Sequence, residues 1–107
     1  MNDNGTLILK RGDTSPSLAW QVDVAPGQTW VGANAKFRLR HKNGGQFLID
    51  EDGVIDTQNN TLTYNWSIGD TDNDGEYLAD FQVTFADQSK ETFPSDGFIR
   101  VKIGPSL

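Results

Sequence analysis

Residues 70–86 of the chain, DTDNDGEYLADFQVTFA, decide the fold. An acidic turn that contains a glycine runs into a strict alternation of side chains. One face of the alternation carries Tyr77, Ala79, Phe81, Val83 and Phe85, and the opposite face carries Glu76, Leu78, Asp80, Gln82 and Thr84. A period of two with aromatic and β-branched residues on one face predicts a half-buried strand in a sandwich or barrel.

The acidic turn before this strand has two interpretations. Asp70, Asp72 and Asp74 followed by Gly75 match the first half of a calcium-binding EF-hand loop, which requires a bidentate Glu at its twelfth position. That position is Phe81, inside the strand. Gly75-Glu76-Tyr77 is also typical of the start of a strand that carries a tyrosine corner. We therefore favour a structural turn and predict no metal or cofactor, with calcium on the three aspartates as the weaker alternative.

The rest of the chain contains further short alternating or apolar segments separated by turn residues. Asn43-Gly44-Gly45 predicts a tight hairpin, and Gly32 indicates a bulge or a close backbone approach. No segment has the apolar period of a helix. Together with the strand that begins at Glu76, the expected strands are Thr6–Lys10, Ser17–Val24, Ala35–Lys42, Gln46–Asp50, Val54–Thr57, Thr61–Trp66, Lys90–Phe93 and Phe98–Ile103.

This spacing of short strands predicts an all-β fold, an antiparallel immunoglobulin-like sandwich of about 7–9 strands. We expect Glu51-Asp52-Gly53 and Gln58-Asn59-Asn60 to be turns within it. With 107 residues the chain is expected to form a single domain over residues 1–107, with flexible ends at 1–5 and 104–107.

Composition excludes some functions and disfavours others. The chain has 15 Asp and Glu against 9 Lys and Arg, a net charge of −6, and no cysteine. Disulfides, thiolate metal sites and cysteine nucleophiles are therefore excluded, and nucleic-acid binding is disfavoured because it needs a basic footprint. No apolar run approaches the about 20 residues of a membrane span. The first residues do not resemble a secretion signal, so we expect a soluble protein made in a cytoplasm.

The basic side chains suggest the main candidate site. Lys36, Arg38, Arg40 and Lys42 alternate along one strand and should all face outward. In an immunoglobulin-like arrangement their neighbour is the strand with Glu76 and Asp80, and beyond it lies the strand with Arg100 and Lys102. The stripe is therefore expected either to form solvated cross-strand pairs or to serve as a partner-facing patch.

Two aromatic residues complete the candidate partner-binding residues. Trp30 stands at the start of a strand and Phe98 faces outward, so both are expected to be partly exposed. The predicted partner-binding residues are Trp30, Lys36, Arg38, Arg40 and Phe98.

No catalytic residue is predicted. His41 is the only histidine and has no second histidine or cysteine with which to share a metal. Asp50, Glu51 and Asp52 are adjacent on one expected turn, so they do not face one another across a cleft as two acid–base carboxylates would.

Four stretches resemble a known family. They are KRGDTSPSL (10–18), GANAKFRLR (32–40), YNW (64–66) with DTDNDGEY (70–77), and FQVTFAD (81–87) with ETFP (91–94) and GFI (97–99). In this order and spacing they are similar to the N-terminal domain of bacteriophage upper baseplate proteins, an immunoglobulin-like β-sandwich.

The resemblance implies a structural role in a phage or prophage virion. We expect a non-enzymatic tail or baseplate component, made in the host bacterial cytoplasm, that docks onto other virion proteins in a symmetric oligomer without nucleic acid or membrane. The alternative is a carbohydrate- or host-surface-binding module of similar fold, in which Trp30 and Phe98 would form the aromatic contact.

Overall fold

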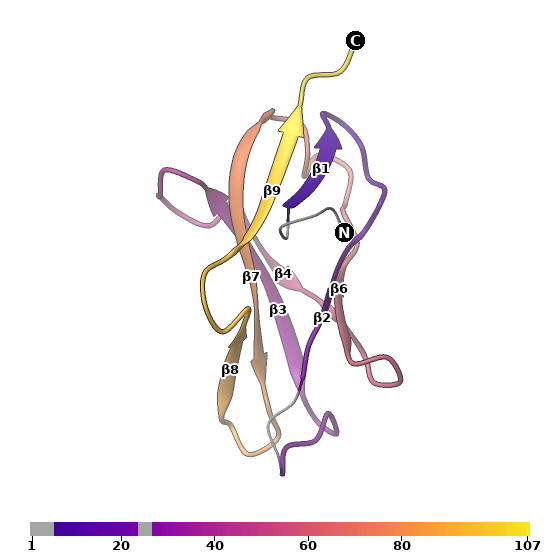
Figure 1. Ribbon diagram of the computed structural model, residues 1–107, viewed down its shortest axis with the longest axis vertical. Coiled ribbons are helices and arrows are strands. Elements are labelled where there is room, and N and C mark those ends of the chain that lie inside the picture. Colours follow the sequence, from indigo (N-terminus) through magenta and orange to yellow (C-terminus); the bar gives the residue numbers. More distant parts are fainter. Residues whose placement is uncertain (1–5, 24–26) are drawn as a thin grey trace.

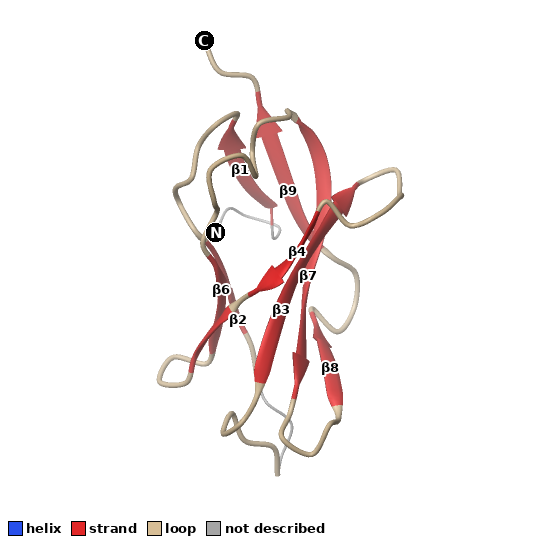
Figure 2. Cartoon of the chain, turned by 180° about the vertical axis from the view of Figure 1, so that it is seen from behind, coloured by secondary structure: helices blue, strands red, loops and turns tan. Residues whose placement is uncertain are grey.

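The computed structural model describes residues 6–23 and 27–107, so Val24 and the expected flexible end 1–5 lie outside the described residues. Within these ranges the chain forms strands and loops and no helix (Figure 2). No helix in the described part is therefore long and apolar enough to cross a bilayer. The strands are β1 (Thr6–Lys10), β2 (Leu18–Gln21), β3 (Asn34–His41), β4 (Ile49–Asp52), β5 (Val54–Asp56), β6 (Thr61–Tyr64), β7 (Gly75–Thr84), β8 (Lys90–Phe93) and β9 (Ile99–Gly104).

The strands form two sheets that pack face to face (Figure 1). The larger sheet has the order β1-β9-β7-β3-β4, with β8 beside the second half of β7, and the smaller has the order β2-β6-β5. Every pair is antiparallel except β1 with β9, which is parallel. This is the strand order of an immunoglobulin-like sandwich, and the predicted fold class is confirmed.

The core lies between the two sheets and is built around the strand that begins after the acidic turn. All five side chains predicted to point inward from β7 are at most 6% exposed. Phe37 of β3 is fully buried, stacks on Tyr64 of the smaller sheet at 4.3 Å between ring centroids, and contacts Trp66 edge-on at 5.7 Å. These rings join the two sheets, because each pair has one ring on either side of the interface.

The acidic turn holds β7 in place by hydrogen bonds. The Tyr77 hydroxyl donates to the Asn73 carbonyl oxygen at 2.7 Å, which is the tyrosine corner expected from Gly75-Glu76-Tyr77. Thr71 is buried, and its hydroxyl donates to the Asp13 carbonyl oxygen at 2.6 Å. The turn therefore connects the start of β7 to the loop between β1 and β2.

The chain changes sheets at Gly53. The prediction of a turn at Glu51-Asp52-Gly53 is wrong for the first two residues, which belong to β4 in the larger sheet. Gly53 donates its amide to the Ala35 carbonyl oxygen, and β5 then continues in the smaller sheet. A Cβ at Gly53 would lie 3.2 Å from the Phe81 ring, so glycine fits because the backbone passes directly over a core ring.

Loops account for the other differences. β3 and β4 form the expected hairpin, but the tight turn predicted between them is wrong. Leu39 pairs with Ile49, so Asn43-Gly44-Gly45 lies within a longer connection. β4 therefore begins three residues later than expected. Gly32 makes the expected close approach, with its Cβ position 3.0 Å from the Ala86 Cβ, although it lies in a turn with φ +75° and not in a strand bulge. Gly104, expected in a flexible end, is the last residue of β9.

Candidate functional site

The outer surface of the larger sheet collects nearly all the basic side chains of the protein. Because the core takes every second residue of each strand, the residues between them must face water. Paired residues in neighbouring strands share a face, so the registers define this surface. We call it the cationic face; it carries eight of the nine Lys and Arg, namely Lys10, Lys36, Arg38, Arg40, Lys90, Arg100 and Lys102 on strands and Lys42 directly after β3.

Four carboxylates share the cationic face, which leaves it a net charge of +4, whereas the whole chain has −6. The remainder of the sequence therefore carries −10. Such a separation of charge produces a local positive potential on an acidic protein and attracts anions to one side of the molecule. The four carboxylates are Asp50, Asp52, Glu76 and Asp80.

Three ion pairs neutralise part of this surface. Arg38 binds Asp80 with two parallel bonds, Nε to Oδ1 at 2.8 Å and a terminal nitrogen to Oδ2 at 2.9 Å, and their side chains are only 21% and 13% exposed. Lys36 with Asp52 and Lys42 with Glu76 are looser pairs at 3.3 Å. Pairing of the basic stripe with Glu76 and Asp80 across strands is therefore present, as the first of the two alternatives expected.

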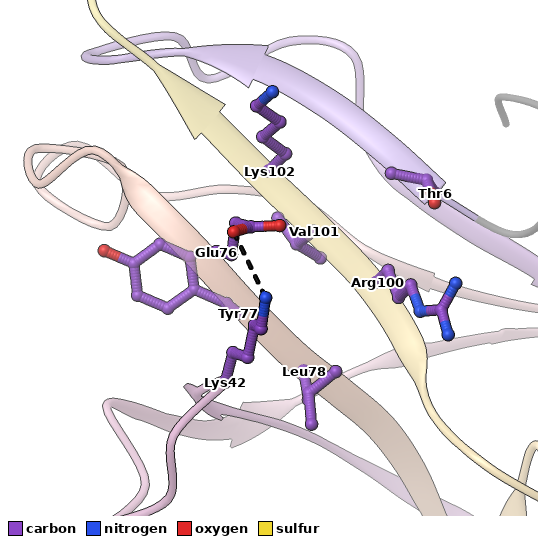
Figure 3. A pocket seen from close by; sticks show the side chains of 8 residues that line it. All are labelled: Thr6, Lys42, Glu76, Tyr77, Leu78, Arg100, Val101 and Lys102. Carbon is purple, nitrogen blue, oxygen red and sulfur yellow. Dashed lines mark hydrogen bonds and ion pairs between the residues drawn. The ribbon is translucent and has the colours of Figure 1, made fainter.

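The other five cations of the cationic face form no ion pair with a described residue, and three of them, Arg40, Arg100 and Lys102, stand near the middle strands of the sheet. Within the described residues, no carboxylate oxygen lies within 4 Å of a side-chain nitrogen of Arg40, Arg100 or Lys102. Arg100 and Lys102 stand on β9 beside a groove of about 480 Å³, whose floor includes Leu78 and whose far rim is the Lys42–Glu76 pair (Figure 3). The groove thus has two cations available to an anion.

Apolar side chains lie among these cations. Arg40 is held over the Phe98 ring at 5.3 Å, and Arg38 is held over the Phe47 ring at 5.2 Å. Phe47 and Phe98 are about half exposed, and they line a small hollow together with the partly buried Leu78. Stacking on an aromatic ring fixes a guanidinium plane and leaves its N–H groups free for a ligand.

The structure brings together four of the five predicted partner-binding residues and separates the fifth. Lys36, Arg38, Arg40 and Phe98 share the cationic face. Trp30 does not: its indole nitrogen donates to Asn60 Oδ1 at 2.9 Å, and its ring stacks on Phe85 at 6.2 Å, against the core at one end of the sandwich.

Sequence reasoning did not select Arg100, Lys102 or Phe47 as site residues. The alternation placed the two cations outward, and the expected strand order placed their strand beyond the one with Glu76 and Asp80. Only the registers show that Arg100 lies across Leu78 from Arg40. Phe47 was expected inside a strand and instead lies in the loop before β4, so no periodicity indicated its exposure.

The three aspartates of the acidic turn do not converge. Asp70 accepts from the Tyr64 hydroxyl at 2.6 Å and from the Ser67 amide at 2.8 Å, while Asp72 and Asp74 are exposed. Burial, and then the hydrogen bond to Asp70, raise the pKa of Tyr64 well above its usual range. Asp70 therefore organises the loop after β6, and no cluster of three His, Asp or Glu suited to a metal occurs among residues 6–23 and 27–107.

The remaining titratable candidates are also engaged or isolated. His41 is exposed, lies edge-on to Tyr77, and accepts from the Asn43 amide at 3.2 Å. Asp50, Glu51 and Asp52 lie along β4 and not on a turn, and Asp52 pairs with Lys36. In the described part of the chain these groups form no nucleophile–base pair.

A comparison with solved structures finds a similar fold in CopC from Methylosinus trichosporium OB3b. The two share 11% sequence identity, the match covers 95% of this chain and 86% of that one, and the TM-score is 0.55. No family model matches the chain, and no curated protein matches it. At this identity the likeness shows the fold alone, a β-sandwich.

The comparison corrects the functional prediction. The similar structure is CopC and not a component of a phage particle. The prediction of a bacteriophage virion protein, in the tail or baseplate, is therefore wrong. The carbohydrate-binding alternative loses Trp30, which packs on Phe85 and does not stand on the surface beside Phe98. The function must therefore be argued from the cationic face.

Proposed function

We propose that this chain is a non-catalytic binding module that takes an anionic ligand on the cationic face. The observation that carries the proposal is that Arg100 and Lys102 line a groove on a sheet face and have no carboxylate partner among the described residues. Arg40, on the same face, also has no carboxylate partner within this part of the chain. An exposed cation on a protein of net charge −6 could pair locally with many carboxylates. Here the nearby carboxylates Glu76 and Asp80 are already paired with Lys42 and Arg38.

The sheet gives this site a rigid base. Leu78 on β7 pairs with Arg100 on β9 and with Arg40 on β3, so the two arginines flank one apolar side chain on three hydrogen-bonded strands. The backbones of these strands are about 4.8 Å apart. A site on strands is held more firmly than a site on loops, which lowers the ordering cost of binding.

The charge distribution supports an anion and also orients it. The surface that surrounds the groove carries a net +4, and the rest of the sequence carries −10. An approaching anion is therefore attracted to one side of the molecule and repelled from the others, which favours binding in a single orientation.

A binding role, as opposed to catalysis, is supported by the chemistry of the groove. Its ionisable lining residues are Lys42, Glu76, Arg100 and Lys102, together with the hydroxyl of Tyr77. Glu76 is paired with Lys42, and the Tyr77 hydroxyl donates to the Asn73 carbonyl oxygen, so neither is free to act as a base.

Binding of fluorescently labelled poly-L-glutamate, followed by anisotropy at about 10 mM and about 500 mM NaCl, tests the proposal. We expect binding at low salt that weakens at high salt. Arg100→Glu with Lys102→Glu should weaken it at least tenfold, which corresponds to about 1.4 kcal/mol.

A matched control for Arg100→Glu alone is Arg11→Glu, which makes the same change of net charge outside the cationic face. We expect this variant to bind within about threefold of the unmodified chain, because exposed charges far from a ligand are screened. The proposal is overturned if poly-L-glutamate does not bind at low salt, or if the control variant loses as much affinity as Arg100→Glu.

A further inference from the structure

The apolar part of the cationic face narrows the class of ligand. Phe98 is 49% exposed, Phe47 is 50% exposed, and Leu78, which lines the same hollow, is only partly buried. Inorganic phosphate has no apolar group to cover these side chains. A ligand with both carboxylates and apolar side chains covers them and removes apolar area from water.

We propose that the anionic ligand is a segment of an acidic polypeptide in extended conformation, with the pattern Glu-x-Leu-x-Glu or its Asp and aliphatic equivalents. This inference rests on the proposed anion-binding function and names its ligand. The two carboxylates bind Arg100 and Arg40, and the central apolar side chain packs on Leu78 and Phe98.

The spacing of the sheet fits this pattern. Arg100, Leu78 and Arg40 form one row across β9, β7 and β3, about 10 Å from end to end at about 4.8 Å between strands. In an extended peptide, residues i, i+2 and i+4 point to the same side and span about 13 Å. The long, flexible arginine side chains can span the difference of about 3 Å between the row and the peptide. Each carboxylate of the peptide then meets an arginine, and the apolar side chain between them meets Leu78.

The arginine of β3 is arranged for a carboxylate. The Arg40 guanidinium lies over the Phe98 ring and donates one bond to the His41 carbonyl oxygen at 3.3 Å, which fixes its orientation. A planar guanidinium held in this way offers parallel N–H donors to the two oxygens of a carboxylate.

A long polyanion such as a nucleic acid fits less well. The positive potential is confined to one sheet face, and the rest of the sequence carries −10. A chain of phosphates that extends beyond the face meets repulsion, whereas a short acidic segment ends within it. Arginine and aromatic residues are also enriched in protein–protein interfaces, as they are on this face.

Two labelled peptides of equal charge test the inference: Gly-Glu-Ser-Leu-Ser-Glu-Gly, and the same peptide with Ser in place of Leu. Binding is measured by anisotropy at about 10 mM NaCl. We expect the Leu peptide to bind at least fivefold tighter than the Ser peptide. Phe98→Ala should reduce this ratio to below twofold. Val31→Ala, which also removes apolar atoms from an exposed side chain (78%) but in a loop away from the face, should leave the ratio unchanged. Arg40→Gln should weaken both peptides.

The outcomes separate this inference from the proposed function. If both peptides bind with equal affinity, the face binds anions without contacting an apolar side chain of the ligand. In that case the inference of an acidic segment with a central apolar residue fails, and the proposed anion binding stands. If neither peptide nor poly-L-glutamate binds, both fail. Light scattering after gel filtration tests for one further outcome. The unmodified chain could oligomerise at low salt while Arg100→Glu with Lys102→Glu stays monomeric. The face is then covered by a second copy of the chain, and the acidic-segment inference is overturned.

Discussion

Two ion pairs on β3 allow the effect of burial on ion-pair strength to be measured within one sheet. Arg38–Asp80 and Lys36–Asp52 both join residues directly opposite each other in neighbouring strands. The first pair is bidentate, with side chains 21% and 13% exposed, and the second has one contact at 3.3 Å, with side chains 51% and 86% exposed. We predict that their coupling energies differ severalfold in a double-mutant cycle.

The magnitude follows from the two geometries. Exposed pairs contribute about 0.2–1 kcal/mol because water and salt screen them, so Lys36–Asp52 should couple by no more than about 0.5 kcal/mol. Charge-assisted hydrogen bonds contribute about 1.5–3 kcal/mol, so Arg38–Asp80 should couple by about 2 kcal/mol. Arg38→Met alone should cost slightly more, about 2–3 kcal/mol, because Asp80 is left mostly buried without a partner.

The assay is urea unfolding followed by tryptophan fluorescence. One cycle uses Arg38→Met, Asp80→Leu and the double variant, and the other uses Lys36→Met, Asp52→Leu and their double variant. Each cycle gives a coupling energy as the departure from additivity. A repeat at about 1 M NaCl, where the screening length is about 3 Å, should abolish the coupling of the exposed pair and leave most of the coupling of Arg38–Asp80.

Two results would refute this reasoning. Equal coupling energies in the two cycles would mean that burial and bidentate geometry do not decide the strength of these pairs. Loss of the Arg38–Asp80 coupling in high salt would mean that water reaches the pair in solution.

Three further predictions concern the fold. Tyr77→Phe should destabilise the protein by about 1 kcal/mol, since it removes the hydrogen bond to the carbonyl oxygen of the acidic turn, and should lower the melting temperature by roughly 4–8 °C; an unchanged melting temperature would contradict the tyrosine corner. Gly32→Ala should lower the free energy of urea unfolding clearly more than Gly69→Ala does. Both glycines have positive φ, but only at Gly32 would the new Cβ meet another atom, the Ala86 Cβ at 3.0 Å. Equal losses of stability in the two variants would rule out the clash. The free energy of unfolding should fall as pH rises above about 10. Burial raises the pKa of Tyr64 in the folded chain, while in the unfolded chain Tyr64 ionises at its ordinary pKa of 10.0. In Tyr64→Phe the decline measured by urea unfolding at pH 9, 10 and 11 should be shallower, and an unchanged slope would exclude Tyr64 as its source.

Much of the fold could be predicted because a half-buried strand requires apolar residues at every second position, and this alternation is visible in the sequence. The alternation from Tyr77 to Phe85 and from Ile99 to Ile103 gives the inward faces correctly, since a one-residue shift would turn every apolar side chain to water. Loop length leaves no such pattern. Gly44 and Gly45 indicate positive φ, which the structure shows at both, but glycines in a longer loop have the same property as glycines in a two-residue turn.

The candidate site could be predicted only in part, for a different physical reason. Outward positions along one strand follow from its own sequence, and Lys36, Arg38 and Arg40 were found in this way. Which strands are neighbours depends on the whole fold, so the row of Arg100, Leu78 and Arg40 becomes visible only with the registers. The separate position of Trp30 could not be predicted, because a side chain next to a strand can turn either to solvent or toward the core. Here its indole nitrogen donates to Asn60 Oδ1.

The parallel pairing of β1 with β9 has a consequence for how the chain folds. β1 is the first strand and β9 the last, and within the described residues β1 has no other strand partner. During synthesis β1 cannot form this pair until β9 has left the ribosome, whereas β3 can pair with β7 before β9 exists. Leu7 and Leu9 are buried in the folded chain, and we expect them to lack their β9 neighbours for that interval. Because β1 and β9 are the two paired strands farthest apart in the sequence, we expect their pairing to be slow, and deletion of β9 removes the strand partner of β1 as well.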